Sequence, residues 1–443
     1  MISINVGQSG NRIGSRCFEL YCLEHAIGKD GILDTNIQGT NGNSNDLVFR
    51  NFFTESQNIK NKFIPRALFM DTEPETINTI KKYDDYRSMY RESNFLMCKE
   101  GASDIFSRGK YTVGRELQDP MQEKIRSMVE ECDNFGGFLL YRSICGGTGS
   151  GLGSGVLQHL GEEYTKKVKL DFNLFPSPNQ SNNVVSPYNA AMALMDMIEY
   201  ADFNMIFDNE ALYDMLKKSL AMDKTSYQEI NSLMAHANSH LTSSLRFPEN
   251  YGESQIYLTE LMQTGIVPYP KLHFLLPSYA PLVKKNAFQS SIPVPNLIKS
   301  IFTPDSLMAK VDNSKCKYMS SYMFFRGEII ASEIIKPLNE VKSKKLVEFV
   351  DWSPSGFRVG INHSPSLTYG DLSKTPKSLL MLSNNTSITK IFKKIEDNFS
   401  SLYRTRAFAH WFVGEGLESS ELQECFEQLK QLADDYQSIH TSS

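Results

Sequence analysis

Residues 138–152, with the sequence FLLYRSICGGTGSGL, decide the fold of this chain. An apolar run typical of a buried strand leads directly into a glycine-rich turn, and a helical pattern begins at Leu152. Glycines let backbone N–H groups approach and surround an anion, and the N-terminus of the following helix adds its positive dipole. The hydroxyls of Thr148 and Ser150 can add donors. The segment therefore predicts a strand, an anion-binding turn and a helix.

The two commonest phosphate-binding motifs are absent from this turn. No lysine follows a G-x-x-x-x-G spacing, which excludes a P-loop. No register gives G-x-G-x-x-G, the dinucleotide fingerprint, and this argues against a dehydrogenase with a nicotinamide cofactor. For a glycine turn taken alone, a tight connection without any ligand is a further alternative.

Short apolar strands alternate with amphipathic helices on both sides of this segment. We expect further strands at residues 2–6, 66–71, 170–175 and 203–207. Alternation of this kind predicts a parallel sheet covered by helices on both faces, with ligands bound outside the carboxyl ends of the strands. Those ends carry the glycine turn and three polar positions, namely Gln8, Asp71 and Asn209.

The second half of the chain has a different pattern. A long helical stretch is expected from residue 210 towards 245, and the end of the chain is helical again at residues 388–403 and 421–436. Between them we expect strands, at residues 267–270, 317–325 and 346–352. The chain therefore divides into three predicted parts, residues 1–208, 209–385 and 386–443.

The composition is that of an ordinary globular protein. The chain has 443 residues, 41% hydrophobic and 22% charged, which suits about three domains. Its net charge of -5 and its lack of basic clusters disfavour nucleic-acid binding. Seven widely spaced cysteines without a Cys-x-x-Cys favour reduced cytosolic thiols over disulfides or zinc. The first residues do not form a signal peptide, and no apolar run approaches the ~20 residues that span a bilayer, so no membrane contact is expected.

The glycine turn is one of several stretches with a familiar sequence. Residues 143–151 resemble the tubulin signature, and further similar stretches are spread along the chain, at residues 2–10, 19–25, 267–270, 349–352 and 406–411. The chain is identified as a member of the tubulin family. This resemblance implies an α/β fold: a Rossmann-like parallel-sheet GTPase domain, an α+β intermediate domain and a C-terminal helical region.

Three features resemble the α type rather than the β type. They are residues 19–25, the long loop between Asn362 and Lys377, and above all Leu258-Thr259-Glu260-Leu261, where the β type carries a lysine in place of glutamate. The resemblance implies an α-tubulin-like subunit of cytoplasmic microtubules that binds GTP and forms a heterodimer with β-tubulin. The alternative is a divergent, non-hydrolysing tubulin-like protein that caps or modulates filaments.

The resemblance also implies roles for individual residues. The GTP phosphates are expected to bind to Gln8, Ser143, Gly146, Gly147, Thr148 and Gly149. Asp71 and Glu73 match the acidic pair near Mg²⁺, which favours hard oxygen ligands, although a helix N-terminal charge is the structural alternative for them. Asn209 and Asn231 are expected to contact the guanine, with Tyr227 stacked on it. Asn182 is expected to lie near the ribose.

Glu260 is the expected catalytic residue. In the family this glutamate projects towards the GTP of the adjoining β subunit and is thought to orient or activate the attacking water, so hydrolysis requires assembly. The GTP of the α subunit itself is not turned over.

Several positions depart from the family pattern. Cys145 replaces a glycine, Asp104 stands where asparagine is usual, Gly101 replaces an aspartate, and Ser186 replaces a ribose-contacting glutamate. Tyr257 replaces an aspartate three residues before Glu260. No acidic residue follows Asp435, so motors and microtubule-associated proteins that read an acidic tail should bind less well.

Four aromatic side chains complete the expectations. His236 and His240 are spaced i, i+4 on a predicted helix, for which a place on the helix surface or in helix packing is favoured over a zinc site because no third ligand is apparent. Trp352 and Trp411 are expected in the core.

Overall fold

The structure is a computed structural model. It describes residues 1–33, 51–56, 59, 61–177, 183–220, 225–247, 265–283, 292–313, 315–344, 347–353, 356–367 and 375–442. Three positions discussed above, Asn182, Tyr257 and Glu260, lie outside these residues.

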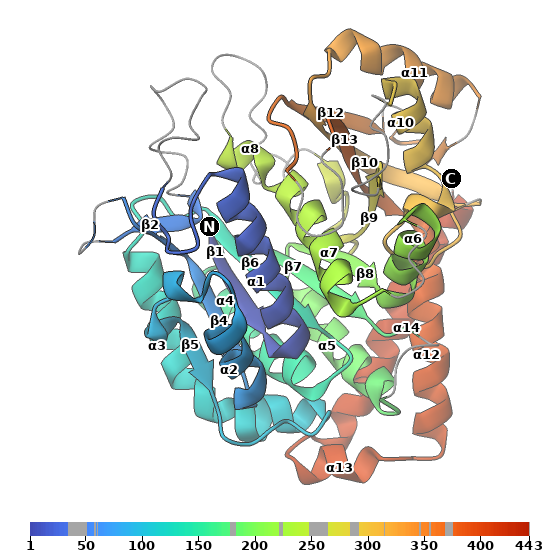
Figure 1. The fold of residues 1–443 in the computed structure, drawn as a ribbon. Coiled ribbons are helices and arrows are strands. Elements are labelled where there is room, and N and C mark those ends of the chain that lie inside the picture. Colours follow the sequence, from blue (N-terminus) through green and yellow to red (C-terminus); the bar gives the residue numbers. More distant parts are fainter. Residues whose placement is uncertain are drawn as a thin grey trace.

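One large sheet runs through the molecule (Figure 1). It has eleven strands in the order β11-β10-β13-β9-β8-β7-β6-β1-β4-β5, and β12 pairs with β10. All neighbours from β9 to β5 are parallel, whereas β13 is antiparallel to both β9 and β10. The strands are β1 (Ile2–Val6), β4 (Ala67–Asp71), β5 (Phe95–Met97), β6 (Gly137–Ser143), β7 (Val168–Phe175), β8 (Phe203–Asp208), β9 (Phe274–Ala280), β10 (Lys317–Gly327), β11 (Glu348–Phe349), β12 (Phe357–Asn362) and β13 (Lys377–Asn385). A separate hairpin pairs β2 (Phe53–Glu55) with β3 (Phe63–Pro65).

Helices cover both faces of the parallel part, as predicted (Figure 1). Alternate residues of each strand point to opposite faces, so Phe138 and Leu140 join one core, while Leu139 and Tyr141 join the other. The first core includes residues of α3 (Gln118–Glu130), α4 (Gly153–Glu163) and α5 (Ser186–Tyr200). The second includes residues of α1 (Gly7–Glu24), α6 (Asn209–Leu220) and α7 (Tyr227–Leu241).

The remaining helices flank this sheet. Near its β10–β13 end lie α10 (Val294–Ile301) and α11 (Ala331–Ser343), which close a third core, and the C-terminal helices pack against α5. The latter are α12 (Thr389–Arg404), α13 (Ala409–Gly414) and α14 (Ser419–Ser442). Two further helices are α2 (Pro74–Tyr83) and α8 (Ser243–Arg246). Among the described residues, no helix is long and apolar enough to cross a membrane.

Several local expectations were wrong. The helical stretch from residue 210 is not continuous, because Ser226 and Glu229 form a capping box that starts α7 at Tyr227. Residues 267–270 form no strand, whereas the strand that follows them, β9, was missed. Of the strand expected at residues 346–352, only Glu348–Phe349 is a strand within the described part.

The aromatic expectations divide between right and wrong. His236 and His240 are buried in α7, so helix packing is confirmed for both. Trp352 and Trp411 are not core residues, since they are 49% and 57% exposed. Trp352 packs edge-on against Tyr269, which is itself 48% exposed.

Candidate functional site

A polar cavity of about 550 Å³ lies at the carboxyl ends of the parallel strands. Parallel pairing brings the ends of β1, β4, β6, β7 and β8 to one edge of the sheet, so the residues that follow these strands meet there. Most of the sequence-predicted site residues line this cavity, namely Gln8, Asp71, Glu73, Ser143, Gly146, Gly147, Thr148, Gly149, Asn209 and Tyr227.

The glycine turn forms one wall of the cavity because it has no side chains where the backbone is crowded. A Cβ atom at Gly149 would stand 2.2 Å from the carbonyl oxygen of Ser143, and one at Gly147 would stand 2.6 Å from the amide nitrogen of Ile105. The turn continues as a π-helical segment, Thr148–Leu152, which runs into α4. The helix therefore begins a few residues earlier than Leu152, and the glycines pack closely against two neighbouring segments.

An amide that the sequence did not single out holds these segments together. Asn189, fully buried in α5, donates from Nδ2 to the carbonyl oxygens of Asp104 (2.7 Å) and Cys145 (2.9 Å). Its Oδ1 accepts from the backbone N–H of Phe106 at 3.0 Å. Asn183 also donates to the Cys145 carbonyl oxygen, at 3.1 Å. The only sequence signal for Asn189 is a polar residue within an otherwise apolar stretch of helix.

Carboxylates line the side of the cavity next to β4. Asp71 is buried, which raises its pKa to about 6, although hydrogen bonds from the backbone of Glu73 and Thr72 and from Asn11 work against this shift. Glu73, Glu75 and Asp104 are exposed and line the same cavity. The Thr72 hydroxyl lies 2.6 Å from that of Thr148 and so links this side to the glycine turn.

These oxygen donors fit Mg²⁺, provided that a phosphate shares the ion. Mg²⁺ takes oxygen ligands and is commonly held by one or two carboxylates together with phosphates. Within the described residues, no group of three or more His, Cys, Asp or Glu side chains is placed to hold a metal by itself. Asp71 and Glu73 therefore suit a metal that arrives with a nucleotide.

An aromatic ring and two amides lie at the other end of the site. Tyr227 is 59% exposed at the start of α7, and Asn209 starts α6. Asn231, one turn further along α7, lines a neighbouring cavity of about 430 Å³ that also includes Tyr227 and Arg12. An exposed tyrosine ring next to amides can stack on a base and hydrogen-bond to its edge.

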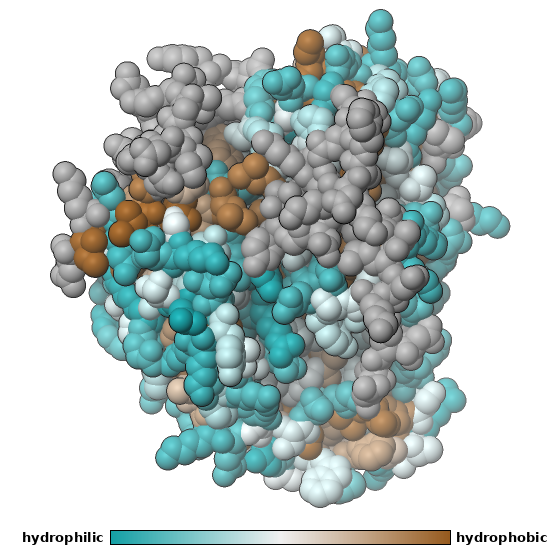
Figure 2. Space-filling view, in the orientation of Figure 1, coloured by the Kyte–Doolittle hydropathy of each residue, from teal (hydrophilic) through white to brown (hydrophobic). Residues whose placement is uncertain are grey.

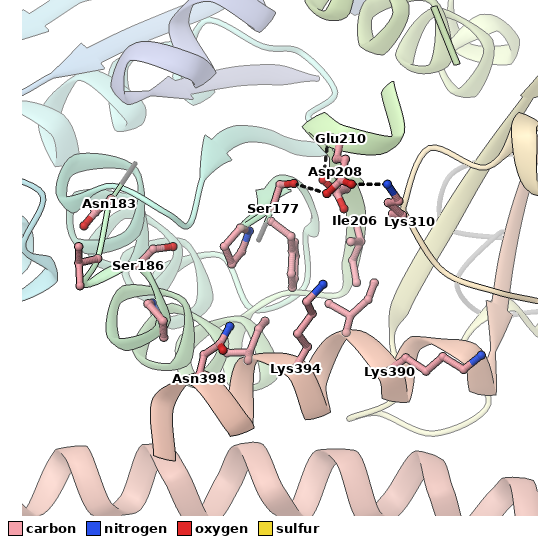
Figure 3. A pocket seen from close by; sticks show the side chains of 16 residues that line it. Ser177, Asn183, Ser186, Ile206, Asp208, Glu210, Lys310, Lys390, Lys394 and Asn398 are labelled. Atoms are coloured by element: carbon pink, nitrogen blue, oxygen red, sulfur yellow. Dashed lines mark hydrogen bonds and ion pairs between the residues drawn. The ribbon is translucent and has the colours of Figure 1, made fainter. Parts of the chain in front are cut away.

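A smaller cavity of about 300 Å³ adjoins the first and shares Phe175, Ser177 and Asn183 with it. Figure 3 shows its polar side, where the Ser177 hydroxyl donates to Glu210 at 3.0 Å and Lys310 forms an ion pair with the same carboxylate. Ser186 lines this cavity, and its buried hydroxyl has no hydrogen-bond partner among the described residues.

Of the other departures, Cys145 lines the cavity, and Gly101 lies next to Glu73, which also lines it. Burial raises the pKa of the Cys145 thiol to about 11, so this cysteine stays neutral at physiological pH. A Cβ atom at Gly101 would stand 2.1 Å from Oε1 of Glu73, which means that the Glu73 carboxylate fills the space of a side chain at this position.

Comparison with known proteins agrees with this geometry. Residues 1–217 match the family model of the tubulin/FtsZ GTPase domain, and residues 270–397 match that of the tubulin C-terminal domain. The tubulin alpha-2 chain of Eleusine indica is 41% identical over 99% of this chain and 97% of its own length. The tubulin alpha-1B chain of Physarum polycephalum is 40% identical and the tubulin alpha-1 chain of Arabidopsis thaliana 39%, each over 99% of this chain and 96% of the relative. The match to the GTPase-domain model, residues 1–217, includes every strand whose carboxyl end lies at the cavity.

Proposed function

Because the chain belongs to the tubulin family, we propose that it is an α-tubulin-like subunit of cytoplasmic microtubules that binds GTP with Mg²⁺ and forms a heterodimer with β-tubulin. The observation that carries the proposal is the polar cavity between the glycine turn and Tyr227. Its lining includes an anion-binding turn at one end and, at the other end, an aromatic ring that can stack on a base.

The residues have distinct roles in this proposal. Gln8, Ser143 and the backbone of Gly146–Gly149 bind the phosphates, with the Thr148 hydroxyl as a further donor. Asp71 and Glu73 hold Mg²⁺ against the phosphates, and the bound ion supplies charge neutralisation there. Tyr227 stacks on guanine, and Asn209 and Asn231 read its edge. Asn182 is assigned to the ribose by the resemblance alone, as it lies outside the described residues.

Exposed apolar side chains at two ends of the molecule support assembly into filaments. Phe408, Trp411 and Val413 are exposed on and next to α13, which lies at the lower end of the molecule (Figure 1). Figure 2 shows a group of apolar atoms at the lower right of the molecule. Ile330 and Ile335 are exposed at α11, which lies at the opposite end (Figure 1). Two different patches at opposite ends allow head-to-tail contacts, which continue into a filament when they do not close into a ring.

Hydrolysis is proposed to depend on this assembly. Glu260 is assigned as the residue that orients water at the GTP of the adjoining β subunit, so that turnover occurs in the polymer and not in the free chain.

Co-polymerisation with a purified β-tubulin tests the proposal. The full chain should enter the lattice in constant ratio to its partner, and denaturation should release a guanine nucleotide. Release of a nicotinamide dinucleotide instead would end the GTP assignment. In mixed polymers, Glu260→Ala should lower GTP turnover, and an unchanged rate would remove Glu260 from the mechanism.

A second candidate function is a binding-only protein that caps or modulates filaments. It is favoured by Asp104 and Cys145, two departures from the family pattern that both line the nucleotide cavity. A chain that binds guanine nucleotide and β-tubulin but stops growth at filament ends, instead of spreading through the lattice, would support this candidate over the first.

A further inference from the structure

We propose that Asp104 makes nucleotide binding by this chain depend on a divalent cation, so that the site accepts the metal complex of GTP and rejects the free nucleotide. The proposal rests on the function proposed above and concerns the specificity of that same site. Its physical basis is a carboxylate beside the glycine turn, in a cavity whose described lining residues include no lysine or arginine.

The position of Asp104 is set by close packing. Its Oδ1 lies 3.3 Å from the point where a Cβ atom at Gly146 would stand. The loop that carries it also touches the next glycine, since a Cβ atom at Gly147 would be 2.9 Å from the carbonyl oxygen of Ala102. Asn189 holds the backbone of Asp104 and the start of the glycine turn through one amide. The backbone of Asp104 is therefore held beside the glycine turn, and its carboxylate lines the cavity next to Gly146.

The backbone explains an asparagine or an aspartate at this position, but it does not require the charge. Ser103 and Asp104 have φ values of 49° and 58°, in the left-handed region where asparagine and aspartate are enriched among non-glycine residues. An asparagine would satisfy the same backbone and keep nearly the same shape. Compared with an asparagine, the aspartate therefore adds only a negative charge, and the fold does not require that charge.

The other charges of the cavity make this addition significant. Four carboxylates line it, those of Asp71, Glu73, Glu75 and Asp104, whereas none of its described lining residues is a lysine or arginine. A triphosphate that enters without a metal meets repulsion from these groups and finds no side-chain cation to offset it. A divalent ion between phosphate and carboxylate turns the same groups from repulsive to attractive.

The decisive measurement is the affinity of the full chain for radiolabelled GTP, with saturating Mg²⁺ and with the metal removed by EDTA. Asp104→Asn should raise the affinity for metal-free GTP by at least about tenfold and change the affinity in Mg²⁺ by less than about threefold. Asp104→Glu should keep the dependence of the parent. Asp133→Asn removes an exposed carboxylate outside the cavity and should alter neither affinity.

Each result has a distinct meaning. If Asp104→Asn changes both affinities by the same factor, or changes neither, the carboxylate does not couple metal to nucleotide and the inference is wrong while the GTP site stands. If neither the parent nor the variant binds guanine nucleotide under either condition, the proposed function fails, and the role of Asp104 fails with it.

Discussion

Glu24, at the end of α1, is a buried carboxylate between two arginines from distant parts of the chain. Its Oε1 lies 2.8 Å from Nη1 of Arg326 in β10, and its Oε2 lies 2.5 Å from Nη1 of Arg246 in α8. The Ser239 hydroxyl in α7 lies 2.8 Å from both carboxylate oxygens. All three charged side chains are at most 1% exposed, so water cannot replace a lost partner.

Glu24→Ala removes the one negative charge of this network and leaves two guanidinium groups in the interior. Breaking a buried ion pair in this way costs about 3–5 kcal/mol, a large share of the 5–15 kcal/mol by which typical domains are stable. Burial by itself would raise the pKa of Glu24, but the two arginines outweigh it and hold this pKa below its usual range. The stabilisation is therefore present above the unfolded pKa of about 4.3 and is lost as the pH falls from there towards the folded value.

Denaturant unfolding of the full chain measures this loss. The matched control is Glu123→Ala, which breaks an exposed ion pair with Arg126 at 2.7 Å, where both side chains are more than half exposed. An exposed pair contributes no more than about 1 kcal/mol. If Glu24→Ala lowers the free energy of unfolding by no more than the control does, the buried network does not stabilise the fold as argued.

Three further predictions concern the site and its supporting helix. Gly147→Ala should weaken GTP binding by more than about tenfold in a retention assay, because the added Cβ would stand 2.6 Å from the Ile105 nitrogen. The control is Gly155→Ala, whose added Cβ meets nothing within 4 Å, and this variant should raise stability by about 0.5–1 kcal/mol in thermal unfolding. Burial lowers the pKa of His236 to about 4, so between about pH 6.5 and 4 the unfolded chain binds more protons than the folded chain. The free energy of unfolding should therefore decrease as the pH is lowered through that window, and it should decrease less steeply in the variant His236→Gln. Tyr227→Ala should cost about 1–3 kcal/mol of GTP affinity by equilibrium binding if the ring stacks on the base.

The parts of the site that the sequence could predict are those that depend on local order along the chain. The glycine turn directly follows β6 and precedes α4, so its position at the end of a strand and the start of a helix was readable from residues 138–152. The parallel topology follows from the alternation of strands and helices, and the fold class is confirmed by the tubulin family match. Asp71 and Gln8 were found in the same way, as residues at strand ends.

Other features depend on neighbours that are distant in sequence. The strand β9 was missed because its interior Pro277 argues against a central strand, and only the fold shows that β8 and β13 flank it. Asn189 looks like any polar residue of a helix until the fold brings Asp104 and Cys145 within reach of its amide. Trp352 was wrongly expected in the core, since hydrophobic character alone does not tell a core side chain from one on a contact surface.

The sequence by itself determined the elements around the glycine turn, and it showed which polar residues follow the ends of the parallel strands. Only the tertiary structure decided which charged side chains lie close together. Examples are Glu24 between two arginines and the polar cavity, whose described lining has carboxylates but no side-chain cation. The physical reason is that hydrogen bonding and hydrophobic periodicity act over a few residues of chain. Burial and electrostatic interactions depend instead on distances in space, which the folded chain alone fixes.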